Sequence, residues 1–359
     1  MSAVLRSWEM TTLTKVPAAG ATVTATSSPL PGMALILAIA VGARLLSPYT
    51  GAIPDVVLAL IAGILLRNLL RLPAGIRPGV AFTLRYLLRA AIILFGAGLT
   101  FEAVLQTGAA TLTLVVLCFA VAMGLGLLLA SVFRLPGTVG TLIGAGTAIC
   151  GGSAILALGP LVRAKDEEIA YAITTIFTFN IVALLLYPPL GHLLHLSSAA
   201  FGSWTGTAVN DTSVVVATGF IFSHAAGATA TIVKLTRTLL LVPLAIGVGL
   251  RYGAGAGNEP DGQAQPNVWQ RVKGIVPWFI FGFIGMAALN SLHAFSPDTA
   301  HALTLGAGFL IVMVLAGVGL NVDAVKISRM GLRPLGVGML LASLMAVISL
   351  SLVHFLHIG

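Results

Sequence analysis

Long apolar runs follow one another through almost the whole chain, and they restrict the fold more than any other feature. A helix needs about 20 apolar residues to cross the hydrocarbon core of a bilayer, and the chain offers about eleven such runs. They lie near 33–48, 54–70, 79–99, 104–132, 137–161, 168–190, 199–223, 227–250, 273–292, 300–320 and 333–356. Charged residues make up only 8% of the chain, against about 25% in soluble proteins. We therefore predict an all-α integral membrane protein with about 10–11 transmembrane helices.

Positive residues are placed as in a multi-pass membrane protein. The net charge of +8 would suit nucleic acid, but most Lys and Arg stand at the ends of apolar runs, which is typical of cytoplasmic loops. We expect the lipid bilayer as partner and no nucleic acid. If every run crosses once, Arg67, Arg77 and Arg134 share the cytoplasmic side. Arg163 and Lys165 would then lie on the opposite side, as an exception to the rule.

The domain organisation follows from composition. Residues 1–32 are rich in Ala, Thr, Ser and Pro, which predicts a flexible N-terminal tail. Residues 33–359 form a single polytopic transmembrane domain with a loop at 252–270, where Gly, Asn, Pro, Asp and Gln gather. The two cysteines, Cys118 and Cys150, lie inside apolar runs, and no His, Cys and Glu residues have metal-ligand spacing. We expect no cofactor and no metal site.

One short motif occurs twice. Residues 96–104 read GAGLTFEAV and residues 317–325 read GVGLNVDAV, each at the end of an apolar run. The copies lie an odd number of runs apart, so they should face opposite sides of the membrane. Inverted repeats of this kind recur in secondary transporters, with the substrate site at the repeat interface. The simpler alternative is two similar helix ends, each with a glycine cap.

A second pair of similar segments interrupts two apolar runs. Residues 146–155 (GTAICGGSAI) resemble residues 206–215 (GTAVNDTSVV), and both stand in the middle of a run. Adjacent glycines disfavour a continuous helix, and irregular backbone at that depth is tolerated only where protein or a cavity surrounds it. Close packing of small residues is the alternative. We predict two discontinuous or re-entrant helices in the runs 137–161 and 199–223.

Two arrangements of these interrupted runs remain open. Each run could cross the membrane as a broken helix, or each could enter and leave on the same side as a re-entrant hairpin. Hairpins would return Arg163 and Lys165 to the cytoplasmic side and would enter from opposite faces.

Ionisable residues within apolar runs point to a binding site. Lys234 and Arg237 are three residues apart and share one helix face, which suits a divalent or carboxylate anion. Asp211 could neutralise one of these cations, carry a proton or bind a sodium ion. The residues predicted to bind the solute are Thr147, Gly151, Gly152, Ser153, Asn210, Asp211, Thr212, Ser213, Lys234 and Arg237.

The segments 144–163, 206–213 and 233–237 together resemble the YeiH-type family, and the resemblance extends from about residue 33 to the end of the chain. That family consists of bacterial inner-membrane proteins that are often labelled sulfate exporters. It is grouped with the cation:proton antiporter and anion transporter clan, which implies inverted repeats with broken helices and a multi-pass protein of the bacterial inner membrane. Val214 stands where the family often has Gln.

These observations predict a secondary active transporter that works by alternating access around a midplane site. The expected solute is a small anion, such as sulfate, an organosulfonate or a carboxylate, moved as an export substrate with H⁺ or Na⁺ as the coupling ion. A homodimer is an expected assembly. The alternative is a cation:proton antiporter with Asp211 as the ion carrier. An enzyme is not expected, because the chain has neither clustered acids nor a His-rich loop.

Overall fold

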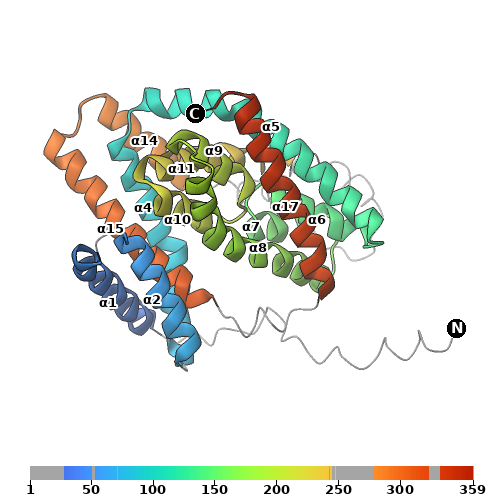
Figure 1. The fold of residues 1–359 in the computed structure, drawn as a ribbon, viewed down its shortest axis with the longest axis horizontal. Helices are drawn as coiled ribbons and strands as arrows, with labels where there is room; N and C mark the ends of the chain where they lie inside the picture. The colour runs from blue at the N-terminus through green and yellow to red at the C-terminus, as the bar shows by residue number, and fades with distance from the viewer. Residues whose placement is uncertain are drawn as a thin grey trace, which may run out of the picture.

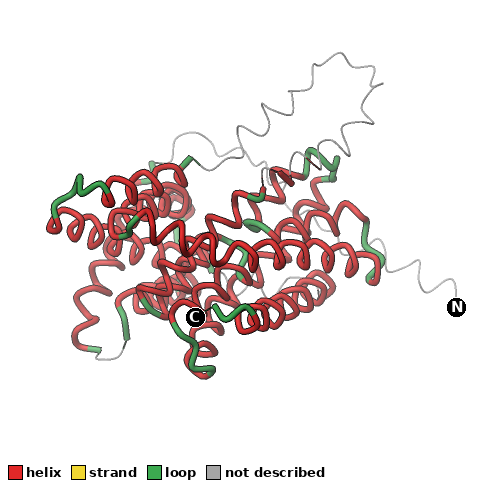
Figure 2. The backbone as a smooth tube through the Cα atoms, turned by 90° about the horizontal axis from the view of Figure 1, so that it is seen from above, coloured by secondary structure: helices red, strands yellow, loops and turns green. Residues whose placement is uncertain are grey.

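The computed structural model describes residues 28–50, 53–70, 72–241, 243–244, 247, 278–322 and 332–358. Every regular element in these ranges is helical (Figure 2). Six helices among them are long and apolar enough to cross a membrane, namely Leu30–Tyr49, Ala74–Gly98, Phe101–Val132, Asp166–Leu193, Pro297–Asn321 and Gly336–Phe355. The predicted all-α membrane class is confirmed. The tail predicted at 1–32 is described only from residue 28, and the loop predicted at 252–270 lies outside the described residues.

One group of helices, here called the scaffold, lies on the left of Figure 1. It consists of α1 (Leu30–Leu46), α2 (Asp55–Leu69), α3 (Arg77–Phe82), the π-helical turn η3 (Thr83–Leu87), α4 (Leu88–Phe95), α14 (Phe279–Ser291) and α15 (Pro297–Asn321). Glycine lets two of these helices pack backbone to backbone: a Cβ atom at Gly63 of α2 would lie 2.5 Å from the carbonyl oxygen of Ala316 in α15. Such a close approach stabilises the helix pair by van der Waals packing, because the hydrophobic effect does not drive helices together in lipid.

A second group, here called the core, lies beside the scaffold on the right of Figure 1. It consists of α5 (Phe101–Val132), α6 (Gly137–Ala148), α7 (Gly152–Leu158), α8 (Asp166–Leu193), α9 (Ser198–Ala208), α10 (Thr212–Phe222), α11 (His224–Leu239) and α17 (Leu332–Phe355). The core meets the scaffold along α10, where the rings of Phe220 and Phe95 pack edge to face with centroids 5.1 Å apart.

The interrupted run 137–161 is a re-entrant hairpin, here called hairpin 1 (α6 and α7). The carboxylate of Glu168, in the first turn of α8, accepts a hydrogen bond from the hydroxyl of Thr138 at the start of α6 (2.9 Å). It also accepts one from the main-chain N–H of Lys165, which follows α7 (2.9 Å). The start and the end of hairpin 1 therefore lie together, at the beginning of α8.

The run 199–223 is a second re-entrant hairpin, here called hairpin 2 (α9 and α10). The hydroxyls of Ser198 and Ser223, at its two ends, lie 2.8 Å apart. The rings of Phe201 and Phe222 stack beside them with centroids 4.0 Å apart. Phe222 also stacks on His192, in the last turn of α8. Hairpin 2 therefore enters from the opposite end of α8, and of the two arrangements open from the sequence, the re-entrant one is observed.

The hairpin arrangement removes the exception to the positive-inside rule that the sequence predicted for Arg163 and Lys165. Because hairpin 1 returns to the end at which it starts, Arg163 and Lys165 lie at the same end of the core as Arg134, which follows α5. From Arg77 the chain crosses to the opposite side along α3 and α4, and it returns along α5 to Arg134. The described basic residues at these helix ends therefore share one side, as the positive-inside rule requires of the cytoplasmic face.

The repeated nine-residue motif is placed at opposite ends of one helix pair. A Cβ atom at Gly98 would lie 2.7 Å from the hydroxyl of Thr304, near the start of α15. A Cβ atom at Gly317, near the end of α15, would instead contact Thr83 at 3.5 Å. The two copies thus face opposite sides, as expected for an inverted repeat, although the second copy is described only to Val322.

Candidate functional site

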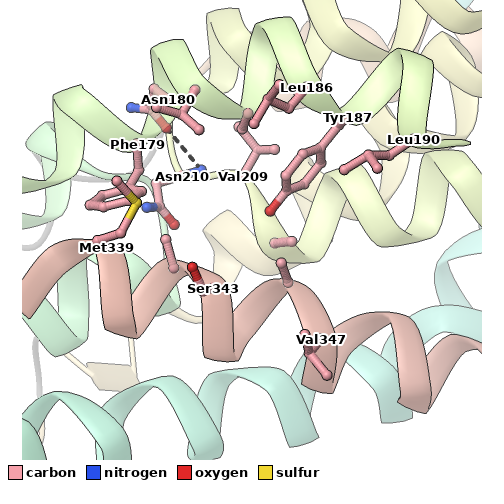
Figure 3. Close-up of a pocket in the computed structure, with 15 residues that line it drawn as sticks. Phe179, Asn180, Leu186, Tyr187, Leu190, Val209, Asn210, Met339, Ser343 and Val347 are labelled. Carbon is pink, nitrogen blue, oxygen red and sulfur yellow. Dashed lines mark hydrogen bonds between the residues drawn. The ribbon is translucent and has the colours of Figure 1, made fainter.

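The turns of the two hairpins meet beside the middle of α8, and we call residues 147–153 and 206–213 the tip junction. Gly151 turns the chain of hairpin 1 with a φ of 66°, a conformation that glycine adopts without strain. A Cβ atom on Gly151 would lie 3.6 Å from the main chain of Asn210 in hairpin 2, so the two turns touch. The amide oxygen of Asn180, in α8, accepts the main-chain N–H groups of Asn210 and Asp211 at 3.2 Å each. Figure 3 shows the first of these two bonds as a dashed line.

Lys234, in α11, joins the two turns. Its side chain is fully buried. The ammonium donates to the carbonyl of Ile149 in hairpin 1 at 2.7 Å. It also donates to the carbonyls of Val209, at 3.4 Å, and Asn210 in hairpin 2. One cation therefore bridges both halves of the tip junction.

Arg237, one turn further along α11, does the same with its guanidinium group and is 1% exposed. It donates to main-chain carbonyls of both hairpins, which are those of Thr147, Ala148, Gly206, Thr207 and Val209. These carbonyls belong to the last turns of α6 and α9, where the helix itself supplies no donor. Arg237 thus satisfies groups that would otherwise be costly to bury at this depth.

Main-chain carbonyls are the main hydrogen-bond partners of the two cations. The sequence predicted that Lys234 and Arg237 face the interior of the helix bundle, where they would suit a divalent or carboxylate anion. Their donors point at main-chain carbonyls, at the negative ends of two helices, and Arg237 also reaches the Oδ1 atom of Asn210 at 3.4 Å. The geometry therefore presents them as groups that hold the tip junction together, and their binding of a solute stays a prediction.

Asp211 begins α10 as its N-cap. Its Oδ1 atom accepts the main-chain N–H groups of Ser213, at 2.9 Å, and Val214, at 3.4 Å, and also the hydroxyl of Ser213. The side chains of Asp211, Thr212 and Ser213 are half-buried, and Ser153 on the opposite turn is exposed. These residues form the accessible part of the tip junction.

The other predicted site residues also lie within the tip junction. Thr147, Gly151 and Asn210 are buried, and Gly152 is half-buried. Asn180 was not among the predicted residues, although it supports the turn of hairpin 2 directly. Its Nδ2 atom has no hydrogen-bond partner within the described part of the chain. The signal in the sequence is Asn180 itself, a single amide in the middle of a predicted membrane-spanning run.

A cavity of about 230 Å³ lies beside the tip junction, between α8, hairpin 2 and α17 (Figure 3). Asn180 and Asn210 line it at the junction, and most of the remaining wall is apolar. Leu186 and Val347 stand at its rim and are more than half exposed. Large exposed apolar side chains on a membrane protein face lipid, so the cavity opens toward the bilayer.

Metal-binding side chains do not gather in the part of the chain that the structure describes. No group of three His, Cys, Asp or Glu residues within it has the geometry of a metal site. Cys118 and Cys150 are both buried as free thiols.

Comparisons with known proteins agree with the fold. The family model described as "Conserved hypothetical protein 698" matches residues 31–338. A UPF0324 membrane protein of Clostridium tetani is 36% identical over 300 residues, covering 82% of this chain and 87% of its own. The UPF0324 membrane protein SpyM3_0740 of Streptococcus pyogenes serotype M3 is 37% identical over 339 residues, covering 92% and 97%. A UPF0324 membrane protein of Streptococcus mutans is 34% identical over 337 residues, covering 92% and 98%.

Proposed function

The chain belongs to the conserved hypothetical protein 698 (UPF0324) family of bacterial multi-pass membrane proteins, and from this premise and its two hairpins we propose that it is a secondary active transporter for a small anion. The membership agrees with the YeiH-type resemblance predicted from the sequence. The names of the relatives state a membrane protein and no solute.

The observation that carries the proposal is the meeting of two re-entrant hairpins from opposite ends of α8. Irregular backbone is costly at membrane depth, because lipid offers it no hydrogen bonds. Secondary transporters use such breaks to form a solute site near the midplane, which can be reached from either side in turn. Here each hairpin enters from its own side of the membrane, and both hairpins turn at the tip junction. One solute site at the tip junction would therefore be accessible from either face in turn.

The cations suggest how access would alternate. Lys234 and Arg237 each bind carbonyls of both hairpins, so the two turns should move together. The opening of one hairpin alone would break buried charged hydrogen bonds, which are stronger than neutral ones. We therefore favour motion of the core against the scaffold, along the surface where Phe220 meets Phe95.

The charge balance of the tip junction supports an anion. Four helix ends meet there, two positive and two negative, and their partial charges offset one another. Lys234 and Arg237 exceed the single carboxylate of Asp211 by one positive charge. In a low-dielectric interior that excess acts over a longer distance than it would in water. Ser153, Thr212 and Ser213 would supply neutral hydrogen bonds at the accessible surface.

A cation:proton antiporter is the second candidate, and one observation favours it. Asp211 is half-buried at the accessible surface of the tip junction, whereas Lys234 is fully covered. A carboxylate in that position is suited to carry a proton or to bind Na⁺. The two candidates differ in what crosses the membrane: an anion in the first and a cation in the second.

Flux into proteoliposomes separates them. Radiolabelled sulfate, an organosulfonate, a dicarboxylate, and Na⁺ are each offered with and without an imposed pH gradient. We expect gradient-dependent uptake of one of the anions. Gradient-dependent Na⁺ flux with none of the anions moving would instead establish the antiporter.

The variant Asp211→Asn tests the coupling ion without disturbing the fold, because Asn caps a helix as well as Asp does. We expect it to keep the thermal stability of the native protein but to lose the response of anion uptake to the gradient. Glu102→Gln, an exposed residue near the start of α5, removes the same charge away from the junction and serves as the control. Fully gradient-driven uptake by Asp211→Asn would exclude Asp211 as the coupling residue.

A further inference from the structure

The cavity between α8, hairpin 2 and α17 has no part in the proposed transport cycle, because none of the described residues that line it carries a charge. Arg237 reaches the Oδ1 atom of Asn210 at 3.4 Å but does not itself line the cavity. A transported anion would exchange water for an uncharged wall here, which is costly. The cavity therefore suits an uncharged occupant.

Uncharged hydrogen-bonding groups are part of the cavity wall. The Nδ2 atom of Asn180 is a donor without a partner within the described ranges of the chain, although Asn180 is only 2% exposed. The hydroxyl oxygens of Tyr187 and Ser343 point into the space between α8 and α17 (Figure 3). A buried donor that lacks an acceptor lowers the stability of the protein. An occupant with an acceptor oxygen, such as the carbonyl of a ketone, would offset that loss.

The wall of the cavity is held in place by contacts behind it. The ring of Tyr187 stacks on that of Trp204 in hairpin 2, with centroids 4.3 Å apart and planes inclined by 2°. The indole N–H of Trp204 donates to the carbonyl of Ala346 in α17 at 2.9 Å. Tyr187 and Ala346 both line the cavity, so these contacts fix hairpin 2 to the helices on its two sides. The cavity is therefore preformed, as binding sites for small molecules usually are.

The depth of the cavity limits which molecules reach it. Asn180 lies halfway along α8, about 20 Å from either end at about 1.5 Å per residue. The charged head group of a phospholipid stays at the membrane surface and does not reach that depth. Leu186 and Val347 at the rim face lipid, which gives a molecule dissolved in the hydrocarbon core a lateral entry. The volume of about 230 Å³ accommodates one end of such a molecule, while the remainder stays in lipid.

We propose that this cavity binds an uncharged, lipophilic carbonyl compound dissolved in the bilayer. Its carbonyl oxygen lies among Asn180, Tyr187 and Ser343, and its apolar remainder extends past the rim into lipid. The amide oxygen of Asn180 supports the turn of hairpin 2, so an occupant bound to the same amide lies against the tip junction. This binding does not depend on the proposed transport function and is measured without it.

Photolabelling of the detergent-purified full chain tests the proposal. The probe is butylbenzophenone, a lipophilic ketone that inserts into neighbouring C–H bonds when it is illuminated, and mass spectrometry of peptides locates the label. The competitors are undecanone, undecane, which lacks the carbonyl, and undecanoate, which carries a charge. We expect the label on peptides of α8 and α17 that line the cavity. Undecanone should displace it at an at least about tenfold lower mole fraction in the micelles than undecane or undecanoate, because only the ketone is an uncharged acceptor.

Two variants locate the site without changing Asn180, which the turn of hairpin 2 requires. Ala342→Phe places a large ring in the cavity and should abolish the label that undecanone displaces. Leu340→Phe places the same ring on the exposed surface of α17 outside the cavity and is the matched control, which should keep the label. Tyr187→Phe/Ser343→Ala removes two hydroxyls but keeps the stacking on Trp204, and should reduce the advantage of undecanone over undecane to about threefold or less.

Three results would overturn the proposal. Equal displacement by undecanone and undecane would assign the cavity to purely apolar chains. Displacement by undecanoate at a lower mole fraction than by undecanone would assign it to a charged ligand. A label that persists in Ala342→Phe would lie on the lipid-facing surface of the protein and not in the cavity.

Discussion

At the scale of single residues, the buried pair Lys234 and Arg237 shows what a sequence can and cannot reveal. Their burial could be predicted, because charged residues three apart in an apolar run must face the protein interior. Their partners could not. Every residue has a main-chain carbonyl, so the sequence does not indicate which of them accept hydrogen bonds from Lys234. Those of Ile149 and Val209 come together only when two hairpins from opposite sides meet.

Replacing Lys234 by Met should destabilise the protein. The methionine keeps the volume of the side chain but leaves the carbonyls of Ile149 and Asn210 without this donor at a depth that water does not reach. We expect the free energy of unfolding to fall by about 3 kcal/mol, with membrane insertion unchanged. Thermal unfolding in detergent measures this effect.

Arg163→Gln removes a positive charge from an exposed loop and is the matched control for this experiment. Its unfolding temperature should equal that of the native protein. If Lys234→Met were as stable as the native protein, the bridging role assigned to Lys234 would be wrong.

At the scale of elements, the breaks in the two hairpins could be predicted and the return of the chain could not. The glycine pair at 151–152 and the polar residues at 210–213 identified where the helices stop. Whether the chain then continued or turned back depended on contacts between distant residues, such as Thr138 with Glu168. The one signal in the sequence was the misplaced charge of Arg163 and Lys165.

A disulfide can test the shape of hairpin 2. The hydroxyls of Ser198 and Ser223 lie 2.8 Å apart, so cysteines at these positions would bring two sulfur atoms close together. In a background with Cys118 and Cys150 replaced by Ala, the variant Ser198→Cys/Ser223→Cys should oxidise readily and lose both free thiols. Thiol titration before and after oxidation measures this.

The pair Ser198→Cys/Ser213→Cys is the control for that experiment. Ser213 lies at the turn of hairpin 2, about 15 Å from its base at about 1.5 Å per helical residue, so this pair should stay reduced. A broken helix that crosses the membrane would hold Ser198 and Ser223 far apart. Free thiols in the first pair after oxidation would therefore contradict the hairpin.

At the scale of the whole molecule, the membrane class followed from composition alone, because no soluble fold could bury so much apolar surface. The division into scaffold and core did not follow from the sequence. The scaffold joins helices from both ends of the chain, α1 to α4 with α14 and α15, while the core takes α17 as well as the central helices (Figure 1). Nothing in the apolar pattern of one run specifies which distant run it packs against.

The orientation of the chain depends on both hairpins at once. If neither hairpin crosses, the loop before α8 lies in the cytoplasm and the loop after α8 lies outside. If both runs crossed as broken helices, these two loops would exchange sides. The orientation of α8 across the membrane is therefore the property that most sharply separates the two architectures.

The most direct test is the labelling of single cysteines with a membrane-impermeant maleimide, in a chain whose Cys118 and Cys150 are replaced by Ala. Glu167→Cys, at the start of α8, and Leu194→Cys, just after its end, are both exposed. We predict that Glu167→Cys reacts only when the reagent reaches the cytoplasmic face and that Leu194→Cys reacts from outside intact cells. The opposite pattern would contradict the two hairpins, and with them the tip junction on which the proposed transport site depends.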